Sequence, residues 1–297
     1  MMKRIIMNLG IFKSVIVNTL ATLFSISSSI LLFVDKEDIG IDSIWKGILT
    51  ICGIVILAII VGLIFVYNYR KKIIFENIQG KLTVRYDDIF KFAFPKWYSK
   101  HKKYKRIVVV GVNTSFDAIV DENVQNISKP LVSINTLHGK WLKKMQEQGI
   151  DGETINAIIK NNFQTHNILP SKTLSVAQKQ RGNLDCYDRG TIAVVEHNNT
   201  IFYLIALSEF DENNNAQNTR KELINTIEKL IMYYDQKGQG YNIYIPLLGT
   251  GMSRTNISAQ EALDTIVSEI KVNRSKIYGK ITIVVNENDR DKISIDV

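Results

Sequence analysis

A glycine-rich segment, YNIYIPLLGTGMSR at 241–254, carries the residue types best suited to bind an anion. Its pattern predicts an apolar strand that runs through Pro246 into Gly249 and Gly251, ahead of a helix that begins near 256. This order presents main-chain N–H groups and a helix N-terminus to an anion, and the glycines let the backbone approach phosphate oxygens closely. The segment favours a diphosphate site, although a purely structural turn also explains it. It is neither a Walker loop nor a Rossmann fingerprint.

A second candidate segment, KRIVVVGVNTSFDAIVD at 105–121, predicts a buried strand followed by a polar turn. The turn begins with Asn113, Thr114, Ser115 and Phe116. Ligands of α/β proteins bind at the carboxyl ends of strands, so Asn113 can donate a hydrogen bond to a ribose hydroxyl. An Asx turn at the strand end explains the same asparagine, and both interpretations stay open.

Histidine and cysteine spacing indicates neither a metal site nor a catalytic pair. The four histidines lack a zinc-like spacing, and Cys52 and Cys186 are too few for a disulfide framework. Cys186 lies in the polar stretch 178–195 with no histidine near it, so we assign that stretch to the loop before a central strand. His138, just before a helical pattern, either contacts a ligand or belongs to the start of the helix.

The hydrophobic pattern from about residue 80 alternates between short β-branched runs and helical periodicity, which is typical of an α/β layered domain. We expect the sheet to be mostly parallel and covered on both faces. The predicted strands lie near 81–86, 106–112, 131–134, 191–195, 200–207, 241–246 and 280–285. The predicted helices lie near 136–148, 153–163, 217–236 and 257–272, the last capped by Asn256 or Ser258.

Together these segments resemble the macro domain family over about residues 80–290. The shared pattern is a strand that ends in an asparagine turn, followed much later by a strand that ends in P-L-x-G-T-G. In addition, RYDDIFKF at 85–92 is similar to the Gly-Asp-Ile segment that opens macro domains. The resemblance implies a three-layer α/β/α fold with a mostly parallel mixed sheet. It also implies a ligand of the ADP-ribose class and no further cofactor.

The resemblance gives each matched residue an expected role. Asp88, with Ile89 beside it, is expected to contact the adenine amino group, and Asn113 to lie near the proximal ribose. The glycine loop is expected to wrap the diphosphate and the distal ribose with Leu248, Gly249, Thr250, Gly251, Met252, Ser253 and Arg254.

One departure from the family pattern bears on activity. Hydrolytic macro domains follow the asparagine turn with a run of glycines, whereas this chain has FDAIVDENVQNISKPLVSINTLHGKWL at 116–142. We expect 133–139 to replace the glycine run, with Asn135, Thr136 and His138 near the ligand and helix N-terminal N–H groups on the anion. The missing glycines favour binding over removal of ADP-ribose, and they suggest a ligand with a modified distal end.

Two apolar runs near the N-terminus, at 11–34 and 44–67, are each long enough to cross a membrane. Basic residues precede the first run and follow the second, and the loop between them is acidic, so both termini are expected in the cytoplasm. The length of the first run disfavours a cleaved signal peptide. We therefore expect a two-helix transmembrane region at 1–72 and a cytoplasmic macro-like domain at 73–297. The hairpin either only anchors the chain or acts on the membrane.

Charge composition does not point to nucleic acid. Residues 1–72 hold 8 Lys/Arg against 4 Asp/Glu, so they account for half of the formal charge of +8. The run KWYSKHKKYKR at 96–106 interleaves basic residues with Trp97, Tyr98 and Tyr104, a composition that suits nucleic acid or anionic lipid. Beside a membrane anchor, lipid headgroups are the nearer partner, and a solvated basic loop explains the run equally well.

Two transmembrane helices joined to a divergent macro domain resemble the transmembrane-macro effectors of the Thoeris antiphage system. In that family a partner TIR-domain enzyme makes an ADP-ribose-derived signal, which the macro domain binds. The resemblance implies a non-enzymatic effector that forms a homo-oligomer in the bacterial inner membrane. On binding the signal, the oligomer is expected to rearrange and to disrupt the membrane lipid. The alternative function is a membrane-tethered ADP-ribosyl hydrolase.

Overall fold

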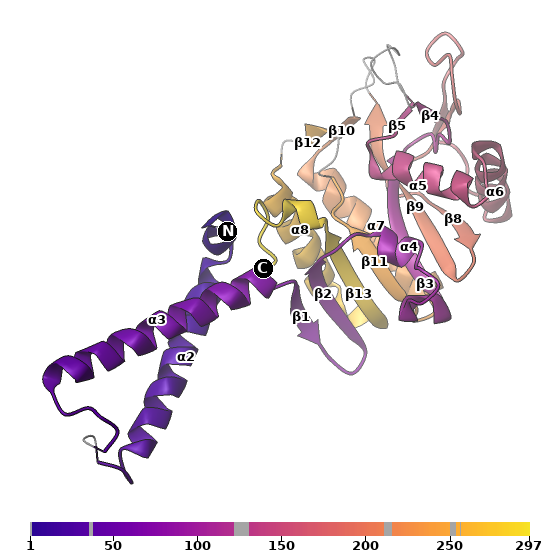
Figure 1. Ribbon diagram of the computed structural model, residues 1–297. Helices are drawn as coiled ribbons and strands as arrows, with labels where there is room; N and C mark the ends of the chain where they lie inside the picture. The colour runs from indigo at the N-terminus through magenta and orange to yellow at the C-terminus, as the bar shows by residue number, and fades with distance from the viewer. Residues whose placement is uncertain (1, 36–37, 122–130, 211–215, 250–253, 256) are drawn as a thin grey trace. The chain divides into compact units, whose positions relative to one another are not determined.

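The structure, a computed structural model, describes residues 2–35, 38–121, 131–210, 216–249, 254–255 and 257–297 (Figure 1). The chain divides into two compact units. The first comprises 1–71 with 288–296, and the second comprises 72–287 with Val297. Each unit is described by itself.

The first unit begins with three helices, α1 (Met2–Met7), α2 (Leu9–Ile30) and α3 (Ile44–Asn68). Gly62 of α3 lies so close to α2 that an added Cβ atom would stand 3.0 Å from the side chains of Phe12 and Ile16. By length and composition both α2 and α3 suit a membrane span. They coincide with the two apolar runs identified in the sequence.

The C-terminal segment 288–296 also belongs to the first unit. Arg290, which is 4% exposed, donates hydrogen bonds to the main-chain carbonyls of Tyr67 and Tyr69 at 2.8 and 2.9 Å. The last carbonyls of a helix lack intrahelical partners and carry partial negative charge, so a buried guanidinium caps α3 well. Ile295 is fully buried in the same segment. This docking was not predicted from the sequence.

The second unit is built on a nine-stranded sheet with the order β1-β2-β13-β11-β3-β9-β10-β12, and β8 also pairs with β9. β2, β13, β11, β3 and β9 are parallel neighbours, whereas β8 is antiparallel to β9. The bounds are β1 Lys71–Glu76, β2 Gly80–Tyr86, β3 Arg106–Asn113, β8 Ile192–His197, β9 Thr200–Phe210, β10 Ala216–Asn218, β11 Asn242–Pro246, β12 Arg254–Thr255 and β13 Gly279–Val285. We call the edge where the parallel strands begin the amino edge, and the edge where they end the carboxyl edge.

Two short ladders lie outside the main sheet. β4 (Val120–Asp121) pairs in parallel with β5 (Val132–Ser133). β6 (Lys172–Thr173) pairs antiparallel with β7 (Asp185–Cys186). The first ladder follows β3 and precedes the nearest helix, so it forms part of the carboxyl edge.

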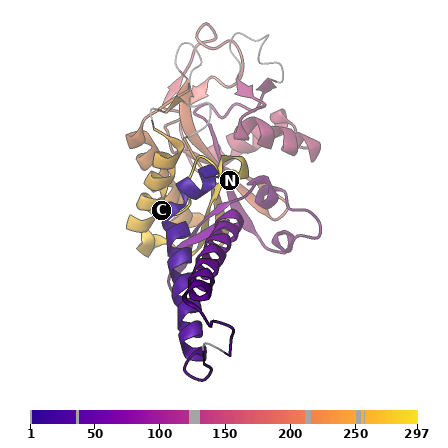
Figure 2. The ribbon, with the colours of Figure 1, turned by 60° about the vertical axis from the view of Figure 1, so that its left-hand side comes forward.

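Helices cover both faces of the main sheet, as Figure 2 shows. α5 (Leu137–Glu147) and α6 (Gly152–Thr165) lie on one face, and α7 (Arg220–Lys237) packs with α8 (Ala259–Val272) on the other. The shorter turns are α4 (Phe90–Ala93) and the 3-10 turns Lys100–Lys103, Arg274–Lys276 and Glu287–Asp289. This arrangement confirms the predicted α/β/α fold with a mostly parallel mixed sheet.

Local sequence explains where α7 and α8 begin. Thr219 and Ser258 each accept the N–H three residues on, and the glutamate at that third position reaches back to the N–H of the cap. The helix start predicted at 217 was wrong, because Thr219 is the cap and 216–218 form β10.

The core between the sheet and the α5–α6 layer is made of large apolar side chains. Trp141 and Met145 of α5 are fully buried, as is Phe202 of β9. Their spacing of four places Trp141 and Met145 on one face of the helix, and burial of each large apolar side chain contributes roughly 1.5–3 kcal/mol. This packing fixes α5, whose N-terminus follows directly on β5 at the carboxyl edge.

We expect Arg290→Met to loosen the C-terminal segment, because the carbonyls of Tyr67 and Tyr69 lose a charged donor. A hydrogen bond from a charged group contributes about 1.5–3 kcal/mol, so exchange of the amides in 290–296 should accelerate roughly 10- to 100-fold. Hydrogen-exchange mass spectrometry on the full chain in detergent measures this. Lys292→Met removes the same charge from a side chain that is 77% exposed, and should change the exchange of these amides little. Equal exchange in the two variants would contradict the capping role.

Candidate functional site

The predicted ligand residues that the structure describes lie at or next to the carboxyl edge of the second unit. β2 ends at Tyr86, β3 at Asn113 and β11 at Pro246. The ends of β2 and β3 are separated by three strand intervals in the sheet, or about 14 Å at roughly 4.8 Å per interval. This edge therefore brings three segments that are distant in sequence to one side of the domain.

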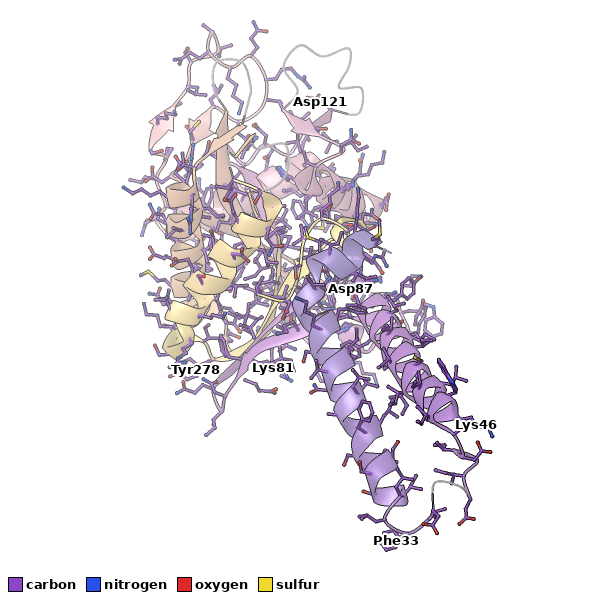
Figure 3. The ribbon with its side chains drawn as sticks, turned by 90° about the vertical axis from the view of Figure 1, so that its left-hand side faces the viewer. Phe33, Lys46, Lys81, Asp87, Asp121 and Tyr278 are labelled. Carbon is purple, nitrogen blue, oxygen red and sulfur yellow. The ribbon has the colours of Figure 1, made fainter. Side chains whose placement is uncertain are left out.

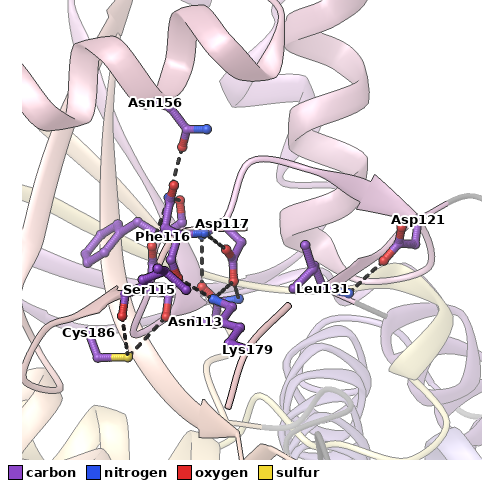
Figure 4. A network of polar contacts seen from close by, with 11 residues as sticks. Asn113, Ser115, Phe116, Asp117, Asp121, Leu131, Asn156, Lys179 and Cys186 are labelled. Carbon is purple, nitrogen blue, oxygen red and sulfur yellow. Dashed lines mark hydrogen bonds and ion pairs between the residues drawn. The ribbon is translucent and has the colours of Figure 1, made fainter. Parts of the chain in front are cut away.

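The turn after β3 is closed by its own side chains (Figure 4). Asn113 is 5% exposed, and its Nδ2 donates to Oδ2 of Asp117 at 2.9 Å. In return, its Oδ1 accepts the main-chain N–H of Asp117 at 3.0 Å. The structure thus shows Asn113 as the cap of this turn, and contact of its side chain with a ribose stays a prediction.

Asp117 ties this turn to a segment more distant in the chain. The carboxylate is 1% exposed; its Oδ2 accepts from Nζ of Lys179 at 2.7 Å and its Oδ1 from the N–H of Asn183 at 2.7 Å. Lys179 also donates to the main-chain carbonyl of Asn183 at 2.6 Å. Burying a carboxylate is costly unless charged and polar donors satisfy it. One ammonium and two amide groups do so here.

The same segment holds the turn at further points. Nδ2 of Asn183 donates to the carbonyls of Ser115 and Phe116 at 3.1 and 3.0 Å. Arg181 pairs with Asp121 of β4 at 2.7 Å. These contacts were missed from the sequence, where the stretch was assigned to a plain loop. Complementary charge in the two segments was the available signal, but only the fold brings them together.

The residues inside the turn are buried and fixed. Thr114, Ser115 and Phe116 are 6, 6 and 1% exposed. Oγ of Ser115 is 3.2 Å from Sγ of Cys186, and the carbonyl of Thr114 accepts the N–H of Tyr187 at 2.9 Å. Phe116 has a φ of 51°, a left-handed conformation that bulky residues rarely adopt. The main chain of this turn is therefore held at several points by the rest of the domain.

The start of α5 is the described feature that best suits an anion. Thr136 caps the helix by accepting the N–H of Gly139 at 3.0 Å, and the other first N–H groups of an α-helix lack intrahelical acceptors. Gly139 permits close approach to β5, because an added Cβ atom would collide with the carbonyl oxygen of Ser133. Asn135 precedes the cap and donates its N–H to Oγ of Ser133 at 3.3 Å.

His138 lies in the first turn of α5. Its ring stacks on Trp141 with 6.3 Å between centroids, and the residue is 8% exposed. Burial lowers the pKa of His138 to about 3, so the imidazole is neutral at physiological pH. Its contact with a ligand stays a prediction, for which the main-chain N–H at the helix start is available as well as the ring.

Two aspartates follow β2 in different environments. Asp87 is buried and pairs with Lys91 at 2.8 Å and with Arg85. Burial raises the pKa of Asp87, but hydrogen bonds from Lys91 and the N–H of Asp88, with the charges of Arg85 and Lys91, hold that pKa below its usual range. Asp88, the predicted adenine contact, is exposed and accepts a main-chain N–H two residues on at 2.9 Å. Ile89 is 8% exposed and packs in the core.

The glycine loop after β11 is described only at its ends. Leu248 is 3% exposed, and Gly249 has a φ of +81°, which glycine adopts without strain. Arg254 begins β12, where it is the register partner of Gln217 in β10. The remaining predicted contacts lie outside the described residues: Thr250, Gly251, Met252 and Ser253.

A groove of about 690 Å³ lies beside the turn, on the α6 side. The groove is lined by Ala118, by Glu153 and Asn156 of α6, and by Asp151, which caps that helix. Two carboxylates at the helix start repel an anionic ligand. The start of α5, rather than that of α6, therefore suits a diphosphate.

The strand order, the two helix layers and the position of the glycine loop are those of a macro domain. A family comparison makes the class specific. The chain belongs to the family described as Thoeris protein ThsA, Macro domain, whose model matches residues 82–286. The match runs from β2 to the end of β13, which confirms the predicted family.

A curated relative, Thoeris protein ThsA of Bacillus amyloliquefaciens (strain Y2), is 23% identical over 256 residues, which cover 82% of this chain and 77% of the relative. Similar solved structures include an Oceanobacillus iheyensis macrodomain mutant with ADPR, at 13% identity and a TM-score of 0.42 over 74% of this chain and 92% of that chain. Another is the Trypanosoma brucei macrodomain in complex with ADP-ribose, at 9% identity and a TM-score of 0.30 over 64% and 65%. At these scores the likeness to the solved structures carries no argument about the site.

We expect Asp117→Asn to destabilise the second unit by about 3–5 kcal/mol, because it leaves the ammonium of Lys179 without its carboxylate. Urea unfolding of the full chain in detergent, followed by tryptophan emission, measures the loss. Asp188→Asn makes the same change at an exposed position of the neighbouring segment and should alter stability by no more than about 0.5 kcal/mol. A loss no larger than that of the control would mean that Asp117 does not hold the turn.

The neutral His138 makes stability depend on pH. Its folded pKa, about 3, lies below the ordinary value of 6.5, so protonation favours the unfolded chain. The contribution is complete above about pH 7 and is lost as the pH falls from 6.5 towards 3, by about 1 kcal/mol at about pH 5.5. In His138→Phe, which keeps a ring against Trp141, the change in unfolding free energy between about pH 7.5 and 5.5 should shrink by that amount. His166→Phe, at an exposed histidine, serves as control; an identical pH dependence in both variants would contradict the burial argument.

Proposed function

We propose that this chain is a membrane-anchored effector of Thoeris antiphage defence, whose macro domain senses an ADP-ribose-derived nucleotide. The observation that carries the proposal is the family match over residues 82–286, joined in the same chain to two helices that suit a membrane span. The relative from Bacillus amyloliquefaciens supports the defence context through its printed name. A TIR-domain enzyme is the partner that supplies the signal, as the family resemblance implies.

The ligand lies along the carboxyl edge, with its adenine end at Asp88 and its diphosphate between the glycine loop and the start of α5. Asp88 offers an exposed carboxylate to the adenine amino group. Main-chain N–H groups at 137–138, together with Gly249 and Gly251, provide the anion contacts. The turn at 113–116 supports the proximal ribose.

Binding without hydrolysis is the proposed activity. In place of a glycine run after the asparagine turn, the described part of the chain forms the ladder β4–β5 and a capped helix start at Thr136. A helix N-terminus holds a diphosphate without supplying a general base. Turnover of ADP-ribosyl conjugates by the purified chain would instead identify the alternative, a membrane-tethered hydrolase.

The signal reaches the first unit through the covalent connections Lys71–Lys72 and Glu287–Asn288. β1 leads through a hairpin into β2, and β13 pairs with β2 along its length, so both connections leave from the carboxyl edge. The N–H of Asp87 donates to the carbonyl of Val285 at 2.9 Å, which links the β2 end to the β13 end. A ligand that binds one arrangement of these ends more tightly than another shifts the chain towards it.

The proposed output is disruption of the inner membrane by an oligomer of the α2–α3 hairpin. Both termini are cytoplasmic, because basic residues flank the outer ends of the two spans and acidic residues lie in the loop between them. A plain anchor needs one span, and this chain has two helices of sufficient length.

Calorimetric titration of the full chain in detergent with ADP-ribose, derivatives substituted on the distal ribose, ADP and NAD tests the binding. We expect ADP-ribose derivatives to bind, and Gly251→Glu to weaken the affinity at least about tenfold, because the new carboxylate repels the diphosphate. Gln164→Glu adds the same charge on exposed α6 and should leave the affinity unchanged. Binding by none of these nucleotides would remove the core of the proposal.

Release of a trapped dye from vesicles that contain the full chain tests the output. The bound nucleotide should accelerate release from vesicles with unaltered chain and leave the Gly251→Glu chain silent, because that variant does not receive the signal. Absence of release in both would reduce the α2–α3 hairpin to an anchor, and release that is equally fast without nucleotide would contradict control by the nucleotide.

A further inference from the structure

The amino edge carries an exposed surface that the nucleotide site does not use. β2, β13, β11, β3 and β9 all begin there, because they are parallel neighbours. Figure 3 shows Lys81 and Tyr278 at this end of the second unit and Asp121 at the other. The loops 76–80, 96–105 and 271–280, which enter β2, β3 and β13, form what we call the amino-edge surface.

Large apolar side chains project into solvent from all three loops. Trp97, Tyr98 and Tyr104 are 81, 65 and 70% exposed. Ile78, at the tip of the β1–β2 hairpin, is fully exposed, and Tyr278 is 54% exposed. Single exposed apolar residues are ordinary on protein surfaces, but a group of this size along one edge marks an interaction site.

Basic residues surround these apolar groups. The loops 96–105 and 271–280 hold five and four lysine or arginine residues, respectively, and no acidic residue. Lys96 and Lys276 are exposed, and Nζ of Lys96 lies 5.8 Å from the ring of Tyr98. Positive charge of the second unit is thus concentrated beside its exposed aromatic side chains.

Two acidic residues beside this surface are already paired. Glu76 accepts from Lys81 at 2.6 Å, and Glu196 lies 3.6 Å from Lys105. Lys105 and Lys237 also line a hollow of about 280 Å³ at the same edge, together with Tyr241 and the carboxylate of Glu196. The exposed lysines outside this hollow are the ones that suit a phosphate group, since ammonium groups bind phosphate as point charges.

The exposed aromatic loop is held in place by a buried arginine. Arg106 is 4% exposed; its Nε donates to the carbonyl of Phe92 at 2.6 Å, and its guanidinium also donates to the carbonyl of Tyr104 at 3.0 Å and to Oγ1 of Thr200 at 2.6 Å. His101, within the same loop, packs edge-on against Phe92 of α4. The loop therefore displays its tryptophan and tyrosines from a fixed frame.

We propose that the amino-edge surface binds an anionic lipid membrane surface. Tryptophan and tyrosine side chains favour the headgroup region of a bilayer, and lysines near an anionic leaflet are attracted to it. Charge complementarity selects this partner, and the same chain carries two apolar helices that suit a membrane span. The inference shares with the proposed function only the membrane anchoring, and does not depend on the nucleotide.

Quenching of Trp97 emission by brominated lipids tests the proposal on the full chain in vesicles. The contribution of Trp97 is the difference in emission between the unaltered chain and Trp97→Phe. We expect Trp97 to be quenched in vesicles that contain phosphatidylglycerol and not in vesicles of phosphatidylcholine alone, and the quenching to be lost at high salt.

The variant Lys103→Gln/Lys276→Gln removes two charges from the surface and should weaken the association roughly 25-fold. Lys160→Gln/Lys221→Gln removes two charges from exposed positions on α6 and α7 and should change nothing. Equal quenching in both lipid compositions, no quenching in either, or equal effects of the two double variants would overturn the proposal. Protection of Trp97 from a soluble quencher by a single-stranded oligonucleotide, with no effect of lipid, would overturn it in favour of nucleic acid.

The result of the lipid measurement can be told apart from the result of the tests of the proposed function. A chain that fails to enter neutral vesicles shows that the anchoring is wrong, and Trp97 quenching in anionic vesicles still decides the role of the surface. Conversely, a chain that binds no nucleotide leaves the lipid measurement unaffected.

Discussion

The buried carboxylate of Asp117 sets the geometry of the carboxyl edge. Without it, the turn after β3 loses its charged anchor, and the crossing segment loses the ion pair of Lys179 and the hydrogen bond from the N–H of Asn183. The segment around Lys179 lies very close to the turn: Gly182 has a φ of +80°, and a Cβ atom there would collide with the Asp117 carboxylate. β4 and β5 lie between this turn and the start of α5, and Arg181 of the same crossing segment pairs with Asp121 of β4.

The domain handles negative charge differently at its two edges. At the carboxyl edge, the start of α5 offers main-chain N–H groups, which are fixed in direction and suit one small anion. The amino edge offers long lysine side chains around exposed aromatic rings, which suit a broad and variable surface. A parallel sheet produces this separation because every strand begins at one edge and ends at the other.

Periodicity and local motifs predicted the strand and helix pattern, because those signals lie within short windows. The parallel core strands, the capping of α8 by Ser258 and the two apolar helices are examples. Long-range pairings left no such signal. The crossing of Lys179 onto Asp117 and the docking of Arg290 on α3 join residues far apart in the chain. For the same reason Asn113 could be assigned to a turn or to a ligand from sequence, and only the position of Asp117 shows the cap.

Hydrogen exchange of the full chain with and without an ADP-ribose derivative tests the central claim, that the carboxyl edge of the macro domain is the nucleotide receiver. We expect slower exchange of the main-chain N–H groups at 114–117, 137–139 and 247–249 in the presence of the nucleotide. Exchange in the loop 96–105 should not change. Protection confined to the amino edge, or to no part of the second unit, would contradict it.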